Sequence, residues 1–402
     1  MADNLAHSIV ARWDHPDVKF VPLLREGGIQ AVVVTSSNDA FADACRSAGI
    51  QIIPAGALQF ADWKTLPGGA TERAVVLTEG QWPGMAPGDG MAGASSGPWV
   101  DANLHWVACL RALHPGRPAL LGYLPKTEQR LTPGYALELA LIEAWAGGGN
   151  YLLALEPAFR EALLRDDARV RDNWRQLGRT AAFLQQNAER FGRPVSPELT
   201  VLVEPGEATP EIANLLFRRC LSPALAPAAE PPAPDGRRCA LVALDLQPPP
   251  ESVRRRILAH AEAGATVAVN GAWWRTSGLK PLRREEDREW FTLGRGRVVA
   301  YHDAIDPSAF GYDAIDLVGQ ERRAARVWSA PAAIALASER QLLVVNYGRP
   351  AGAALARVHG HFASARLLRP DAGPLDLRPA RRGPGTEVEI PQLSRLAVVL
   401  FE

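Results

Sequence analysis

Short apolar runs alternate with helical stretches through the first 195 residues, and this alternation limits the fold more than any other feature of the chain. It is typical of βα units around a parallel sheet, whose strands read as continuous apolar runs because both faces are covered. The clear runs are residues 8–13, 31–36, 51–56, 74–79, 119–124 and 150–156. We therefore expect an α/β fold with a (β/α) barrel over residues 1–195, shortened because a complete barrel has eight strands in about 250 residues.

The rest of the chain changes its pattern twice. Between residues 196 and 320 the βα alternation returns on a smaller scale, which indicates a flavodoxin-like open α/β domain. Within it we expect residues 221–238, rich in Pro and Ala, to form an exposed loop, and the mixed-charge run 282–290 to form a solvated helix. From 321 to 402, strand-like runs are joined by Gly, Pro and Asp turns without room for crossover helices, which predicts an antiparallel β-sandwich.

Charge and motif content exclude several classes of function. Lys plus Arg and Asp plus Glu both number 44, so no net charge attracts nucleic acid or an anionic membrane. No segment approaches the roughly 18 uninterrupted apolar residues of a membrane span, and the start lacks a signal-peptide pattern, so we expect a cytoplasmic protein. Dinucleotide, P-loop, nucleophile-elbow and zinc-protease motifs do not occur in the sequence, and we expect no cofactor.

The metal-ligating residue types show no strong pattern. The four cysteines are far apart with no CxxC pair, which fits reduced thiols better than a zinc site. They are Cys45, Cys109, Cys220 and Cys239. The single HxH pair, His359 and His361, falls in an expected strand, where a period of two puts both side chains on one face. A metal pair there is less probable than two exposed strand residues, so we expect no metal.

Acidic residues close several of the apolar runs in the first domain. In (β/α) barrels the active site forms at the carboxyl ends of the strands, and hydrolysis of a glycoside needs two carboxyl groups across the sugar. Glu79 and Glu156 make the first candidate pair, with Asp14 and Asp101 in reserve. The alternative is that these acids cap helices or pair with arginines, and Pro157 gives Glu156 such a capping position.

The segment after the fourth run favours a binding role. Residues 80–106 contain many glycines and little periodicity, which is long for a loop in a compact domain. Indole rings stack on the apolar faces of sugars, and nearby polar side chains bind the hydroxyls. The alternative for Trp99 and Trp106 is a packing role. The candidate ligand contacts here and at the ends of the first and fifth runs are Asp14, Trp82, Trp99, Asp101, Asn103, His105 and Tyr123.

The order of the three parts resembles bacterial clan-A glycoside hydrolases of the β-galactosidase type. The phrase AWAGGGNYLLAL at 144–155 is similar to the last barrel strand of these enzymes, and VAVNGAWW at 267–274 falls at a strand end of the second domain. The sandwich strands VVNYG, GHFASARLLRP and IPQLSRLAVVLFE are similar to theirs. The resemblance implies a carbohydrate substrate, an amidotransferase-like second domain without amidotransferase chemistry, and a homo-oligomer, because this architecture often forms dimers or trimers.

Two departures from the family pattern keep two hypotheses open. The resemblance implies an Asn-Glu acid/base pair after the fourth strand, where this chain has Thr78 and Glu79. It implies a nucleophile after the strand before 150–156, where the chain has Tyr123, with Glu128 further out in the loop. The first hypothesis is a glycoside hydrolase with Glu79 as acid/base and Glu156 or Glu128 as its partner. The second is an inactive barrel that binds a saccharide or a protein.

Overall fold

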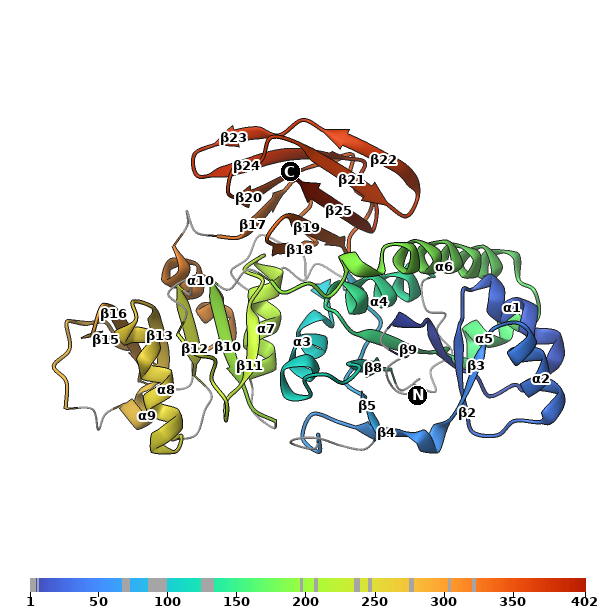
Figure 1. The fold of residues 1–402 in the computed structure, drawn as a ribbon, viewed down its shortest axis with the longest axis horizontal. Helices are drawn as coiled ribbons and strands as arrows, with labels where there is room; N and C mark the ends of the chain where they lie inside the picture. The colour runs from blue at the N-terminus through green and yellow to red at the C-terminus, as the bar shows by residue number, and fades with distance from the viewer. Residues whose placement is uncertain are drawn as a thin grey trace.

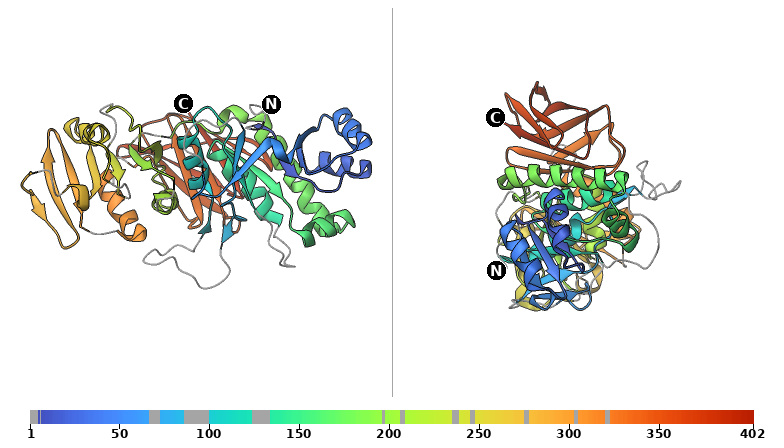
Figure 2. Two further views of the ribbon diagram at one scale, coloured as in Figure 1. Left: turned by 90° about the horizontal axis from the view of Figure 1, so that it is seen from below. Right: turned by 90° about the vertical axis from the view of Figure 1, so that its right-hand side faces the viewer.

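The computed structural model contains a barrel-like α/β part, an open α/β part and an antiparallel β-sandwich, which is the predicted fold class (Figure 1). The two α/β parts lie side by side along the longest axis, and the sandwich covers one side of the molecule (Figure 2). The structure describes residues 5, 7–66, 73–85, 100–123, 134–195, 198–205, 209–234, 239–244, 248–274, 278–302, 305–319 and 323–402.

Seven parallel strands form the first sheet. They are β1 (Val10–Arg12), β2 (Ala31–Val34), β3 (Gln51–Pro54), β4 (Leu58–Ala61), β5 (Ala74–Leu77), β8 (Leu120–Gly122) and β9 (Asn150–Ala154). Their order in the sheet is β3-β2-β1-β9-β8-β5-β4, so the last strand pairs with the first as it does in a closed barrel. The carboxyl ends of all seven strands therefore lie on one rim.

The sheet is open between β3 and β4, which form its two edges although they are consecutive in the chain. A short 3₁₀ turn, η3 (Ala55–Ala57), joins them in place of a helix. Strand β4 was not among the predicted runs because its four residues include Gln59 and the exposed Phe60, and so lack a continuous apolar pattern. The barrel is thus shortened, as predicted, with one strand more than the sequence indicated.

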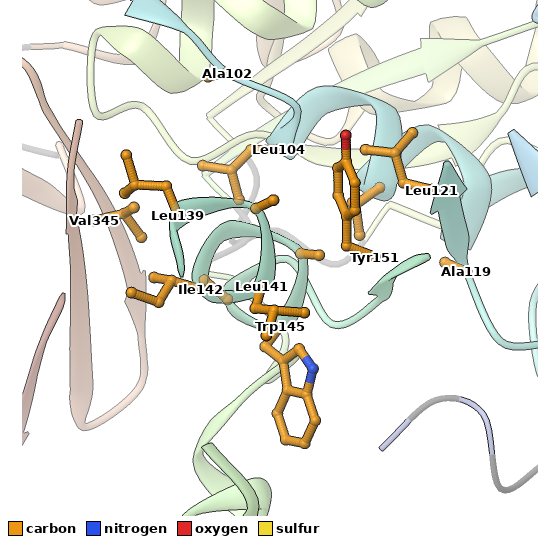
Figure 3. Close-up of a cluster of buried hydrophobic side chains, with 14 of the residues drawn as sticks. Ala102, Leu104, Ala119, Leu121, Leu139, Leu141, Ile142, Trp145, Tyr151 and Val345 are labelled. Carbon is orange, nitrogen blue, oxygen red and sulfur yellow. The ribbon is translucent and has the colours of Figure 1, made fainter. Parts of the chain in front are cut away.

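Helix α4 (Gly134–Ala146) lies between the barrel and the sandwich and is apolar on almost every side, as expected of a fully enclosed helix. Every residue from Ala136 to Ala146 in this helix is buried. In Figure 3, Leu139 and Ile142 lie toward Val345 of the sandwich, and the barrel residue Tyr151 lies on another side of the helix. The helices of this part are α1 (Val21–Glu26), α2 (Asp39–Ser47), α3 (Leu104–Leu113), α4 (Gly134–Ala146), α5 (Pro157–Leu164) and α6 (Ala168–Gln186).

The second sheet has the strand order β11-β10-β12-β13-β16-β15-β14, parallel over its first five strands and antiparallel at β15 and β14. Its strands are β10 (Leu199–Val203), β11 (Ala224–Pro227), β12 (Ala240–Ala243), β13 (Thr266–Asn270), β14 (Arg283–Arg284), β15 (Arg288–Leu293) and β16 (Gly296–Tyr301). Its helices are α7 (Thr209–Arg218), α8 (Glu251–Glu262), α9 (Gly271–Trp274) and α10 (Pro307–Val318). The first strand of this part, β10, lies inside the sheet, with β11 on one side of it and β12 on the other. This order is the flavodoxin-like topology that the sequence predicts.

Two local predictions in this part are wrong. Part of the expected Pro- and Ala-rich loop forms the edge strand β11, which pairs in parallel with β10. An edge strand tolerates proline because one side of its backbone needs no partner. The expected helix at 282–290 instead forms β14 and part of β15, where cross-strand ion pairs such as Arg284 with Glu289 at 2.9 Å account for the mixed charge.

The C-terminal part consists of two antiparallel sheets. One has the order β17-β20-β24-β23 and the other β18-β19-β25-β21-β22. The strands are β17 (Ala325–Trp328), β18 (Ala333–Ser338), β19 (Gln341–Asn346), β20 (Ala353–His359), β21 (Ala365–Arg369), β22 (Ala372–Leu377), β23 (Ala380–Arg382), β24 (Gly385–Pro391) and β25 (Leu396–Phe401).

None of the helices in the described ranges combines the length and apolar character needed to span a membrane.

Candidate functional site at the barrel rim

Three strands that are neighbours in the barrel, β5, β8 and β9, are followed within two residues by Glu79, Tyr123 and Glu156, respectively. The Tyr123 hydroxyl donates a hydrogen bond to Oε1 of Glu156 at 3.2 Å. Glu156 occupies the N-cap position of α5, but its side chain makes no capping bond there. The hydrogen bond from Tyr123 therefore orients this carboxylate along the rim.

Glu79 lies beside the end of the neighbouring strand β4. Its Oε1 accepts a hydrogen bond from the backbone N–H of Trp63 at 3.0 Å, and the residue is partly buried. The preceding Thr78 donates through its hydroxyl to the carbonyl of Ala61 at 3.2 Å, which fixes the end of β5 against β4. Glu79 is thus held in a defined position and still reaches the surface.

Trp82 packs between two tyrosines from the next two strands. Its ring lies 4.9 Å from that of Tyr123 and 5.7 Å from that of Tyr151, the latter nearly parallel at 23°. Trp82 is partly exposed, while its indole Nε1 is buried and has no hydrogen-bond partner among the described residues. A partly exposed aromatic side chain in this setting offers a ring surface to a ligand.

The backbone between Glu79 and Trp82 is held by hydrogen bonds from three directions. Gly80 donates to the carbonyl of Gly122 at 3.1 Å. Asn103 accepts from the Gln81 N–H at 3.0 Å and donates to the Gln81 carbonyl at 2.9 Å. The Tyr151 hydroxyl donates to the same carbonyl at 3.2 Å. The segment that carries Glu79 and Trp82 is therefore preorganised, as a binding or catalytic site requires.

Glu143 supports this arrangement from inside the protein and was not predicted as a site residue. Its carboxylate is fully buried and accepts hydrogen bonds from the Asn103 backbone N–H at 2.8 Å, the Asn103 amide and the Tyr347 hydroxyl at 2.8 Å. Burial raises the pKa of Glu143 to about 7, although these donors oppose the shift. A glutamate within the otherwise apolar stretch 139–146 was the sequence signal for this role.

The structure places Asn103 and His105 inside the protein. Asn103 is fully buried, and its side chain is bonded to Gln81 and Glu143, so it supports the rim without facing a ligand. His105 is buried at the start of α3, its ring lies 4.7 Å from that of Trp106 at a tilt of 40°, and burial lowers its pKa to about 3. Trp106 in turn lies 5.5 Å from Trp63. Asp101, at the end of β7 (Val100–Asp101), is partly buried.

Asp14 extends the rim to the strand on the far side of Glu156. It pairs with Arg12 at 3.6 Å and accepts from the Thr35 hydroxyl at 3.4 Å. A cavity of about 210 Å³ between the ends of β1 and β9 is lined by Arg12, Asp14, Leu155 and Arg160. The rim thus carries Glu79, Tyr123, Glu156 and Asp14 on four strands that are neighbours in the sheet.

Two sequence-predicted site residues, Trp99 and Glu128, lie outside the described residues. Within the described residues, no group of three or more His, Cys, Asp or Glu side chains is arranged to hold a metal ion. His359 and His361 lie far along the chain from the rim, at the end of β20 and just beyond it. The arrangement at the rim therefore consists of carboxylates, aromatic rings and a fixed backbone.

Comparisons with known proteins agree in fold. No family model matches the chain, and neither does any curated protein. The α-L-fucosidase isoenzyme 2 from Paenibacillus thiaminolyticus superposes with a TM-score of 0.58 at 10% identity, covering 98% of this chain and 99% of that one. This chain and the α-L-fucosidase therefore share a fold.

Two β-galactosidases give the same result. Gan42B, a GH42 β-galactosidase from G. stearothermophilus, matches with a TM-score of 0.53 at 11% identity over 82% of this chain. The β-galactosidase from Bacillus circulans sp. alkalophilus matches with a TM-score of 0.54 at 10% identity, also over 82%. The chain spans 60% of the length of both β-galactosidases. At these identities the likeness is one of fold.

Proposed function

We propose that this chain is a glycoside hydrolase-like protein that cleaves a glycoside or oligosaccharide at the barrel rim, with Glu79 and Glu156 as its paired carboxylates. The observation that carries the proposal is that the two acids follow β5 and β9, the two neighbours of β8. Strands in a sheet lie about 4.8 Å apart, so these two strand ends are roughly 10 Å apart. Side chains leaning inward from that span suit the carboxyl separations of about 5–9.5 Å that glycosidases use.

The aromatic residues between the two acids supply the binding surface. Trp82 and Tyr123 present rings on which a sugar can stack. Glu79 then serves as acid/base and Glu156, oriented by Tyr123, as the second carboxylate. The solved structures with a similar fold include an α-L-fucosidase and β-galactosidases, which supports glycosides as the substrate class to test first.

Turnover of aryl glycosides by matched glutamine variants tests the catalytic role. A panel that includes fucosides and galactosides is assayed with the wild type, Glu79→Gln and Glu156→Gln, and with Glu161→Gln on exposed α5 surface as the control. Loss of a general acid or base lowers kcat by about 10²- to 10⁴-fold, whereas the control retains wild-type rates. A wild type that cleaves no member of the panel, or a Glu79→Gln variant as fast as wild type, contradicts the proposal.

The second candidate function is a barrel that binds a saccharide without cleaving it. Specific contacts favour it, because Tyr123 stands where the family resemblance expects a nucleophile, and both acids already accept hydrogen bonds from the protein. Calorimetric titration of oligosaccharides compares the wild type with Trp82→Ala and with Trp328→Ala, an exposed tryptophan of the sandwich. Binding about three- to tenfold weaker in Trp82→Ala alone supports this function. Equal binding in all three proteins, or none in any, counts against it.

A further inference from the structure

A basic cavity of about 300 Å³ lies at the edge of the sandwich, where the chain enters it after α10. Three arginines, Arg323, Arg326 and Arg357, line the cavity with His359 and the turn at 383–385. So far as the described residues go, the lining contains no carboxylate. A volume of this size accommodates a small ligand rather than a few waters.

Two of the arginines are direct cross-strand partners. Arg326 on β17 is opposite Arg357 on β20 in the antiparallel register, so their side chains share one face of the sheet. Like charges directly opposite one another destabilise a sheet. The next residue in this row, Glu387 on β24, is opposite Arg357 but pairs with Arg382 at 3.3 Å. The sheet therefore concentrates positive charge at this position.

Arg323 brings a third guanidinium to the cavity from the segment before β17. It donates to the backbone carbonyl of Arg219 at the end of α7, and its Nε is buried with no hydrogen-bond partner among the described residues. Burial lowers the pKa of Arg323, and the neighbouring Arg326 and Arg219 add to this effect. Burial and the charge of Arg357 likewise lower the pKa of Arg326. The three arginines are thus charged, close to one another and partly shielded from water.

Two glycines leave room for the side chain of Arg357. A Cβ on Gly385 would lie 3.0 Å from Nε of Arg357 and 2.6 Å from the carbonyl of Val358, and one on Gly383 would lie 3.3 Å from the guanidinium. Arg357 itself donates to the backbone carbonyl of Arg382 in the same turn. Arg323 and Arg357 are therefore both anchored by neutral carbonyls, which leaves their charge available to a ligand.

We propose that this cavity binds a phosphate or sulfate group, either as the free ion or as the ester of a sugar. Planar guanidinium groups match tetrahedral oxyanions with paired N–H donors, and three of them offset more than one negative charge. The limited size of the cavity favours a compact anion over a nucleic acid, whose backbone needs an extended basic surface. Because Arg323 is tied to α7 and the other two arginines belong to the sandwich, the bound anion would also join these two parts of the molecule.

Thermal unfolding and calorimetry with three probes test this site. Inorganic phosphate, inorganic sulfate and glucose 6-phosphate are titrated at pH 7.5, with sodium chloride holding the ionic strength constant. The proteins are the wild type, Arg326→Gln, Arg357→Gln and the double variant. Arg366→Gln, an exposed arginine on β21, is the matched control. The unfolding midpoint of each variant in sodium chloride alone checks that the variant is folded.

The expected result is a saturable rise in midpoint with phosphate or sulfate in the wild type and the control, and no rise in the double variant. Each single variant binds about 10- to 100-fold more weakly, the loss that removing one charged hydrogen-bonding group produces. Tighter binding of glucose 6-phosphate than of phosphate identifies the sugar ester as the ligand, and equal binding identifies the free ion. A double variant that responds like the wild type, or a wild type that responds to none of the probes beyond sodium chloride, overturns the proposal.

Discussion

The hydroxyl of Tyr347 donates to the buried carboxylate of Glu143 at 2.8 Å, and this bond connects the β-sandwich to the helix behind the barrel rim. Glu143 also accepts from the backbone N–H of Asn103 at 2.8 Å, and the Asn103 side chain holds Gln81 by two further bonds. An unbroken series of hydrogen bonds therefore runs from the sandwich to the segment that carries Glu79 and Trp82. The sandwich thus supports the geometry of the candidate site.

At pH 8 the buried carboxylate of Glu143 is ionised, because its pKa is raised to about 7. At this pH, replacing Tyr347 with Phe is expected to destabilise the protein by about 1.5–3 kcal/mol, because a buried hydrogen bond to a charged group is lost. Unfolding in urea, followed by fluorescence, measures the change. Tyr135→Phe on α4 is the control, because Tyr135 is 38% exposed and keeps its ring in the variant. Equal midpoints for Tyr347→Phe and the wild type would show that the bond does not contribute to stability.

Stability is expected to fall as the pH rises from about 4.5 to about 7. Burial raises the pKa of Glu143 from 4.5 to about 7, so in this window the folded chain binds a proton that the unfolded chain has released. A shift of this size corresponds to about 3 kcal/mol of stability, present below the window and lost above it.

Glu143→Gln tests this prediction because glutamine cannot ionise. The difference in stability between wild type and Glu143→Gln should favour the wild type more at pH 5 than at pH 7.5. Urea unfolding at the two pH values measures it, with the exposed Glu161→Gln as the control for the charge change. Parallel pH profiles for the wild type and Glu143→Gln would contradict it.

Asn103→Ala is expected to reduce function at the rim more than its effect on stability accounts for. The change removes both side-chain bonds to Gln81, so Glu79 and Trp82 lose their fixed backbone. We expect a loss of about tenfold or more in kcat/KM, or in saccharide affinity if the barrel only binds, because small displacements of catalytic groups have large effects. Asn187→Ala, at the end of α6, is the control. Wild-type function in Asn103→Ala would show that the hydrogen bonds from Asn103 to Gln81 are not needed at the rim.

Gly178→Ala is expected to destabilise the barrel by about 1–3 kcal/mol through overpacking. A Cβ at this position of α6 would lie 2.1 Å from the carbonyl oxygen of Glu26, so α1 and α6 must move apart. Gly56→Ala is the matched control, because a Cβ there meets nothing within 4 Å. Thermal unfolding compares the two variants. An equal midpoint for both would mean that the contact between the helices adjusts freely.

The fold class followed from local patterns in the sequence. Continuous apolar runs indicated buried parallel strands, and closely spaced strands with Gly and Pro turns indicated the sandwich, because these patterns depend on which faces of each element are covered. The placement of acids and indoles at the ends of runs also followed, since parallel strands bring their carboxyl ends to one rim. Glu79, Trp82, Tyr123, Glu156 and Asp14 could be selected in this way.

Other features depended on contacts between distant segments. The opening between β3 and β4, the edge strand β11 and the hairpin at 283–293 are set by which strands meet, and residue periodicity does not report pairing. The burial of Asn103 and His105 is likewise a tertiary effect, because both polar side chains lie in a segment that reads as an open loop.

The sequence by itself thus determined most of the strands and helices and the polar residues that end them. Only the tertiary structure joined Glu143 to Tyr347, 204 residues later in the chain, and set Arg326 opposite Arg357. The physical reason is that burial of a face leaves a mark on every local stretch of sequence. A hydrogen bond or a charge pair between distant residues does not reveal its partner in the sequence, because the contact exists only once the chain has folded.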